Sequence, residues 1–212
     1  MSKNQTQELV ALLDSQPDPL ARFAIALDNM EDWVAADPAG ALAWLAAQPL
    51  TARRSEVIRL AVFQWAESDP AATAAWSKDH LQWVELQNML IRLAEQWVAT
   101  DPVSAARWFS QLPAGPTRVG PLEGMFFRWA GQDPAAARAF QERELPTDPN
   151  TPHILQAIHA GWAKSDPQAA CASSLTASKE SKNPDLFANT LANWATMDVA
   201  SSAAWLIQNV PP

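Results

Sequence analysis

One twelve-residue stretch, WAESDPAATAAW from Trp65 to Trp76, recurs along the chain at an almost constant interval. Each copy begins with a tryptophan, which we call the anchor, and successive anchors lie 32 or 33 residues apart. A period of about 20 to 50 residues is typical of proteins that stack small units into an array. The repeat therefore constrains the fold more strongly than the chain length does. The anchors are Trp33, Trp65, Trp97, Trp129, Trp162 and Trp194.

An aspartate follows every anchor four residues later, and in the first five copies a proline comes next. The aspartate carboxylate can accept hydrogen bonds from the free N–H groups in the first turn of a helix. Proline suits the first helical position and disfavours helical geometry at the residue before it. Each pair is therefore predicted to end one helix, helix A, and to start a shorter one, helix B. The aspartates are Asp37, Asp69, Asp101, Asp133, Asp166 and Asp198.

The composition favours helices over strands, because alanine, leucine and tryptophan dominate the apolar residues and β-branched runs are absent. We predict an all-α fold, a right-handed αα superhelix of about six 32-residue helix-turn-helix repeats plus an N-terminal half repeat. Small residues eight positions after each anchor would let neighbouring helices approach closely. They are Ala41, Thr73, Ala105, Ala137, Ala170 and Ser202. A second aromatic column reads Trp44, Trp76, Trp108, Phe140, Ser173 and Trp205, broken only by the serine.

The whole chain, residues 1–212, is predicted to form a single helical-repeat domain. Residues 5–17 are typical of a capping half repeat, with polar residues outside and one apolar stripe. A long helix is expected to follow from Pro19 to about Ala36. The stripe of the capping helix is formed by Leu9, Val10, Leu12 and Leu13.

Three local features of the later units can also be predicted. Pro121 is expected to start the fourth helix A. The segment Ser178–Pro184 is the most polar connection and is expected to be mobile. The apolar side chains of the last helix are expected to face inward, although the same surface could instead meet a partner or another copy. The residues expected outside are Ser201, Ser202, Gln208 and Asn209.

The formal net charge of −8 argues against nucleic-acid or anionic-lipid binding, which needs clustered lysines and arginines. Part of this acidity is architectural, because six acidic residues are the helix-starting aspartates. The single cysteine, Cys171, excludes an internal disulfide, and no metal site or cofactor is predicted. No apolar segment has the length of a signal peptide or a membrane span, so a cytoplasmic protein is expected.

The segments DPAGALAW, from Asp37 to Trp44, and DPAATAAW, from Asp69 to Trp76, resemble the signature between tetratricopeptide repeats. The resemblance covers about eight residues of each unit, and the period of 32 differs from the roughly 34 residues of that family. The Leu-Gly pair and the tyrosine of that family are absent. The resemblance implies a tetratricopeptide-like helical solenoid that binds proteins or peptides on a concave face, and it carries over no ligand residue.

Chemistry-bearing residues are few. No phosphate-binding loop, dinucleotide fingerprint or zinc-protease motif is present. His159 falls in an apolar column and is predicted to be buried and hydrogen-bonded, and Cys171 is predicted to be a packed thiol. The tryptophan columns could form a ligand cage, but their strict period favours core packing. Trp83 lies outside these columns, which favours its exposure as a binding residue.

A polar strip on helix A is the remaining candidate site. The positions one and five residues before each anchor lie four apart, so they share one helix face. If helix A lines a concave side, this strip could hydrogen-bond an extended peptide, although a solvated strip without a ligand would look the same. The candidate binding residues, with Trp83 added, are Asp28, Asp32, Gln64, Arg92, Gln96, Arg128, Asn189 and Asn193.

The sequence favours a non-enzymatic scaffold or adaptor that binds a protein or peptide partner, because no acid, base and nucleophile converge. Two other classes stay open. One is a self-assembling repeat protein that forms homo-oligomers through its C-terminal helix, and the other is an acidic inhibitor that mimics nucleic acid. Direct binding to nucleic acid or to a membrane is not expected.

Replacing Trp97 with alanine tests the core interpretation of the columns. We expect the Trp97→Ala variant to lose about 3–5 kcal/mol of unfolding free energy, as for the deletion of a core aromatic side chain. Urea unfolding followed by circular dichroism measures this loss. A variant as stable as the parent would mean that the column is exposed and would favour the ligand cage.

Overall fold

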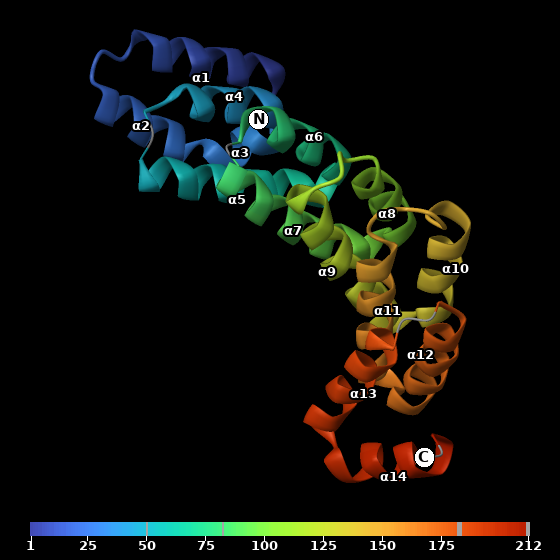
Figure 1. Cartoon of the computed structure of the whole chain (residues 1–212). Helices are drawn as coiled ribbons and strands as arrows, with labels where there is room; N and C mark the ends of the chain where they lie inside the picture. The colour runs from blue at the N-terminus through green and yellow to red at the C-terminus, as the bar shows by residue number, and fades with distance from the viewer. Residues whose placement is uncertain (50, 82, 182–183, 211–212) are drawn as a thin grey trace. The chain divides into compact units, whose positions relative to one another are not determined.

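A computed structural model of the chain (Figure 1) describes residues 1–49, 51–81, 83–181 and 184–210. Over these residues it contains fourteen α-helices and no β-strand, so the predicted all-α class is confirmed. The helices are α1 (Lys3–Ser15), α2 (Pro19–Asp28), α3 (Met30–Ala36), α4 (Pro38–Ala47), α5 (Ala52–Ser68), α6 (Pro70–His80), α7 (Trp83–Thr100), α8 (Pro102–Ser110), α9 (Pro116–Gln132), α10 (Pro134–Glu144), α11 (Thr151–Ser165), α12 (Pro167–Ser181), α13 (Asp185–Met197) and α14 (Val199–Asn209).

The helices group into two compact units, Met1–Met89 and Leu90–Pro212, with the boundary inside α7. In the first unit α3 packs against both α4 and α5, and in the second unit α11 packs against α9, α12 and α13. Helix A of one repeat therefore contacts its own helix B and the helix A that follows. The single domain over residues 1–212 stays a prediction.

Each helix-starting aspartate joins two helices. In the first repeat the Asp37 N–H donates to the Trp33 carbonyl oxygen at 2.7 Å, which closes α3. The Asp37 carboxylate accepts the Gly40 N–H at 3.0 Å, which opens α4. The other five aspartates, including Asp198 without its proline, accept the N–H three residues later at 2.9–3.0 Å. The predicted cap is therefore confirmed in all six repeats.

The aromatic columns form the core. Four anchors are buried, and Trp65 and Trp162 are half-buried. Four anchors contact the second aromatic of their own repeat, with ring centroids 5.5–6.3 Å apart. The small residue eight positions after the anchor is buried in every repeat. Core packing of the columns is confirmed at these positions.

A buried ion pair holds the connection between α10 and α11. The Arg118 guanidinium at the start of α9 pairs with the Asp148 carboxylate, and both side chains are nine-tenths buried. The same carboxylate accepts the Asn150 N–H at 2.8 Å, and the Thr151 hydroxyl donates to the Leu145 carbonyl oxygen at 3.0 Å. Removing one partner of such a pair leaves an uncompensated buried charge, so the pair ties this connection to α9.

Two helix boundaries differ from the prediction. Pro121 lies inside α9, because Gly115 with φ 154° already allows the chain to turn into a helix that starts at Pro116. The helix tolerates the loss of the one backbone hydrogen bond that proline cannot donate. The expected long helix from Pro19 is interrupted at Asn29, whose side chain donates to the Ile25 carbonyl oxygen at 2.9 Å. Such side-chain bonds compete with the helical backbone.

Ser178 is buried at the end of α12 and accepts the Phe187 N–H at 3.0 Å, while residues 182 and 183 lie outside the described part, so the mobility of this connection stays a prediction. Two expectations about exposure are corrected. Leu12 of the capping helix is half exposed rather than packed. In α14, Ser202 is buried because it occupies the small-residue position that is buried in every repeat, and Ile207 is 79% exposed.

In the second unit α9 and α11 approach each other closely. Gly161 of α11 lies against the carbonyl group of Phe127, so a β-carbon at Gly161 would overlap that oxygen atom. Gly131 of α9 faces the Gly161 backbone, where a β-carbon would be 3.5 Å from the carbonyl oxygen. Two glycines at the crossing thus let the backbones touch.

A pair of alanine substitutions tests this crossing. Gly161→Ala should lower the unfolding free energy by about 1–3 kcal/mol or more, because the added β-carbon would overlap the backbone of α9 and push the two helices apart. Gly124→Ala is the matched control, since its β-carbon would meet only the Glu95 side chain at 4.0 Å. We expect the control to gain up to about 1 kcal/mol from helix propensity. Equal unfolding free energies in urea for the two variants would contradict the close approach.

Candidate functional site: a groove across α7, α9 and α11

Two adjoining hollows lie on the second unit, where α7, α9 and α11 run past one another. The larger has a volume of about 470 Å³ and the smaller about 340 Å³. Both are lined by Gly124 and Phe127 of α9, so the two hollows adjoin on either side of the Phe127 side chain. We call the two together the Phe127 groove. The glycine leaves room beside the ring, which is half-buried.

Charged groups of both signs surround the Phe127 ring. The Lys164 ammonium lies 4.4 Å from the ring centroid, a cation–π contact. Arg128 pairs with Glu95 across α7 and α9 at 3.2 Å, with side chains 53% and 38% exposed. His153 lies 2.9 Å from Glu123 across α9 and α11. Exposed pairs of this kind contribute little to stability, so a ligand can exchange them for its own contacts at small cost.

Of the predicted binding residues, only Arg128 lines this groove, although Gly124 and Ala157 of the same strip positions also line it. Arg128 lines the larger hollow, whereas Arg92, Asn189 and Asn193 are exposed elsewhere on α7 and α13, and Gln96 is half-buried. The groove thus brings together one predicted binding residue, two small residues of the strip and several residues from other positions.

In the first unit some residues of the strip are exposed and one is engaged in contacts between helices. Asp28 and Asp32 are exposed, and the Gln64 amide donates to the Glu31 carbonyl oxygen at 2.9 Å, linking α5 to α3. Gln64 is therefore engaged in packing between helices. The side chain of Trp83 lies outside the described part of the structure, so its exposure stays a prediction.

Two of the groove residues that were missed, Glu95 and Phe127, lie two positions before their anchors. This column reads Glu31, Phe63, Glu95 and Phe127 in the first four repeats, an alternation of acid and aromatic. None of the four is buried, although an aromatic two residues from a core tryptophan suggests packing. The alternation was the available signal, because a purely structural column would keep one residue type.

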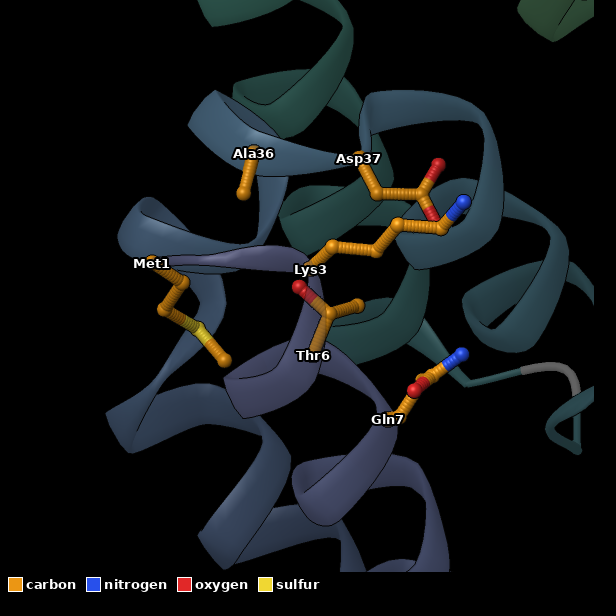
Figure 2. Close-up of a pocket in the computed structure, with 6 residues that line it drawn as sticks. All are labelled: Met1, Lys3, Thr6, Gln7, Ala36 and Asp37. Atoms are coloured by element: carbon orange, nitrogen blue, oxygen red, sulfur yellow. The ribbon is translucent and has the colours of Figure 1, made fainter.

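A second pair of hollows lies in the first unit, between α1 and the junction of α3 and α4 (Figure 2). Their volumes are about 430 and 320 Å³, and Thr6, Gln7 and Asp37 line both. The Lys3 side chain extends along the same side as Asp37 in Figure 2. Because Asp37 is engaged as the cap of α4, these hollows offer a ligand fewer uncommitted groups than the Phe127 groove does.

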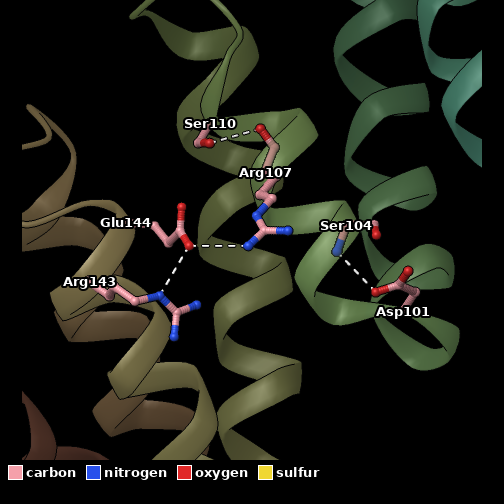
Figure 3. Close-up of polar contacts among 6 residues, drawn as sticks. All are labelled: Asp101, Ser104, Arg107, Ser110, Arg143 and Glu144. Carbon is pink, nitrogen blue, oxygen red and sulfur yellow. Dashed lines mark hydrogen bonds and ion pairs between the residues drawn. The ribbon is translucent and has the colours of Figure 1, made fainter.

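An exposed ion cluster joins α8 to α10 (Figure 3). Glu144 accepts hydrogen bonds from Arg107 at 3.2 Å and from Arg143 at 3.1 Å, and these bonds hold the pKa of the Glu144 carboxyl below its usual value. Figure 3 also shows the cap at the start of α8, where the hydrogen bonds from Ser104 lower the pKa of Asp101. The acidic groups here are paired or act as caps.

A polar cluster around the buried His159 joins the fourth and fifth repeats. His159 is fully buried, and its Nδ1–H donates to the Leu155 carbonyl oxygen at 2.8 Å. Its Nε2 therefore accepts the Ser173 hydroxyl at 3.2 Å, while Arg138 donates to the same hydroxyl oxygen at 2.8 Å. Burial, and secondly the positive charge of Arg138, lowers the pKa of His159. The predicted buried, hydrogen-bonded histidine is confirmed.

Cys171 is packed as predicted. It is fully buried, and burial raises the pKa of its thiol to about 11. The thiol is therefore protonated at neutral pH and is a poor nucleophile. Within the described residues no three His, Cys, Asp or Glu side chains gather in a way that could hold a metal ion. None of the described helices combines the length and apolarity that crossing a membrane requires.

The pH dependence of stability tests the His159 environment. Because its pKa is lower in the folded chain than the usual 6.5, the unfolded chain binds more protons in this range. The stabilisation is complete above pH 6.5 and is lost as the pH falls below it. We expect His159→Leu to reduce the fall in unfolding free energy between pH 7.5 and 5.5. Parallel curves for the variant and the parent would contradict the buried neutral imidazole.

No protein-family model, curated protein or solved structure matches this chain in the comparisons with known proteins.

Proposed function

We propose that the protein is a non-enzymatic scaffold that binds a protein or peptide segment in the Phe127 groove. The observation that supports this most directly is the groove itself, a half-buried aromatic ring within a ring of exposed, mutually paired charges. Aromatic residues and arginines are the residue types enriched at the centres of protein interfaces.

The groove also suggests the chemistry of the partner. An apolar side chain of the partner would lie on Phe127, and a neighbouring carboxylate would meet Lys164 and Arg128, which face the same hollow. Glu95 and Glu123 would disfavour a second acidic residue beyond them. We therefore propose an extended segment with one apolar residue beside one acidic residue.

Binding is favoured over catalysis by the state of the reactive side chains. The hydroxyl of Ser173 is engaged by both His159 and Arg138, and the Cys171 thiol is buried and protonated. Binding is favoured over nucleic-acid mimicry by the mixing of charges, because several exposed acids pair with arginines. These pairs are Glu56 with Arg59, Glu95 with Arg128, and Glu142 with Arg138.

The proposal includes the finer architecture that the repeat predicts, a right-handed tetratricopeptide-like superhelix with its helix A layer on the concave side. Its support is local: helix A contacts the next helix A in α3 and α5, in α9 and α11, and in α11 and α13. The Phe127 groove lies on three consecutive A helices, α7, α9 and α11, which is where such a concave face would be.

Selection from a random peptide library on the immobilised protein tests the groove. We expect the selected peptides to carry the apolar–acidic pair, and Lys164→Glu or Arg128→Glu to weaken their binding at least about tenfold, measured by isothermal titration calorimetry. Phe127→Ala should weaken it by a similar factor.

Lys179→Glu is the matched control for Lys164→Glu. Both lysines are exposed in the last turn of a helix of the second unit, and Lys179 is on α12, outside the residues that line the groove. It should bind the peptides as the parent does. If Lys164→Glu and Phe127→Ala retain parental affinity, or if Lys179→Glu loses as much, the groove is not the binding site.

A further inference from the structure

The two hollows of the Phe127 groove differ in charge. Among the described residues that line the smaller hollow, the one formally charged side chain is Glu123, with His153 counted as neutral. The larger hollow is lined by two basic side chains and one acidic side chain, which are Arg128, Lys164 and Glu95. The proposed binding of an acidic residue uses the larger hollow and assigns no ligand group to the smaller one.

The lining of the smaller hollow suits a long unbranched side chain. Three of its residues have side chains no larger than a methyl group, and the Phe127 ring lies beside them. The three are Gly124, Ala157 and Ala160. Glu123 and the exposed Gln156 add oxygen atoms that can accept hydrogen bonds. Lysine and arginine bury their methylene stems along apolar surface of this kind and keep their charged ends at polar groups.

The Glu123 carboxylate is accessible to a ligand. Its partner is the His153 ring, at 2.9 Å, and the two side chains are 43% and 56% exposed. Exchanging so exposed a pair costs little stability. A lysine or arginine of a ligand carries a full positive charge, and its hydrogen bond to a carboxylate is about twice as strong as one between neutral groups. Such a side chain can therefore take the place of the imidazole.

We propose that the smaller hollow binds a basic side chain, lysine or arginine, of the same segment whose acidic residue lies in the larger hollow. This inference rests on the proposed function of the Phe127 groove and specifies its ligand further. The partner is a segment with a basic residue at one end, an acidic residue at the other, and an apolar residue between them on the Phe127 ring. Its two charges match those of the two hollows.

The positions of the hollows along the helices set the spacing of this motif. Both α9 and α11 contribute earlier residues to the smaller hollow and later residues to the larger one. Glu123 and Arg128 are five residues apart on α9, and Gln156 and Lys164 are eight apart on α11. At about 1.5 Å per helical residue, the two hollows are about 8–12 Å apart. An extended segment rises about 3.3 Å per residue, so its basic and acidic residues are about two to four positions apart.

Three synthetic peptides with acetylated and amidated ends test this assignment. Each carries leucine followed by glutamate, and lysine, norleucine or glutamate stands three residues before that glutamate. By isothermal titration calorimetry, we expect the lysine peptide to bind at least about tenfold more tightly than the norleucine peptide, and the glutamate peptide to bind most weakly. Glu123→Gln should make the lysine and norleucine peptides bind alike. Glu123→Lys should make the glutamate peptide the tightest of the three.

Glu180→Lys is the matched control for Glu123→Lys. Glu180 is an exposed residue of α12 in the second unit and lies outside the described residues that line the groove. This variant should keep the parental preference for lysine.

The outcomes separate this inference from the proposed function. If the parent binds all three peptides equally, or if Glu180→Lys loses the preference as Glu123→Lys does, the smaller hollow does not bind a basic side chain. The proposed function still stands in that case, provided that Phe127→Ala weakens the binding of all three peptides. If the parent binds none of the peptides, the proposed function and this inference are both wrong.

Discussion

The rest of the structure depends on the hydrogen bonds that one aspartate makes in each repeat. Its N–H closes helix A, its carbonyl oxygen accepts the first bond of helix B, and its carboxylate caps the same helix. A single residue therefore sets the angle between two helices, and the small residue four positions later fits into that angle. The anchor tryptophan can reach the second aromatic because this turn is the same each time. Stability of the array follows from the repetition of one joint.

The repeat made most of the fold predictable, because caps and columns are local rules that recur. The departures occur where one residue acts outside its repeat position. Asn29 bonds to its own helix backbone and interrupts it, and Gly115 lets α9 start before Pro121. Ser202 is a serine in a column of buried small residues, so its position in the column was a better guide to burial than its polarity. A single sequence does not show which effect prevails at a given residue, its own side-chain chemistry or its position in the repeat.

The candidate site was less predictable than the fold. Arg128 was placed on the correct helix face, but the residues that complete the groove come from neighbouring helices and from other columns. Lys164 reaches Phe127 only because Gly161 brings α11 against α9. Contacts of this kind depend on how far two helices approach and rotate, which periodicity within one helix does not specify. The alternation of acidic and aromatic residues before the anchors indicates which face of helix A lines the groove, but it does not indicate which residues of the neighbouring helices contact that face.

The polar cluster that joins the fourth and fifth repeats has a consequence for the order of the units. Arg138, His159 and Ser173 each replace an apolar or small residue of a different column, and together they satisfy one another. If another repeat were exchanged into the fifth place, an aromatic ring would stand where Arg138 now finds its hydroxyl partner. An array of interchangeable units can be shuffled, shortened or lengthened without a mismatch. In this chain the cluster makes the fourth and fifth repeats specific partners, so these two units cannot be exchanged for others without leaving polar groups unpaired.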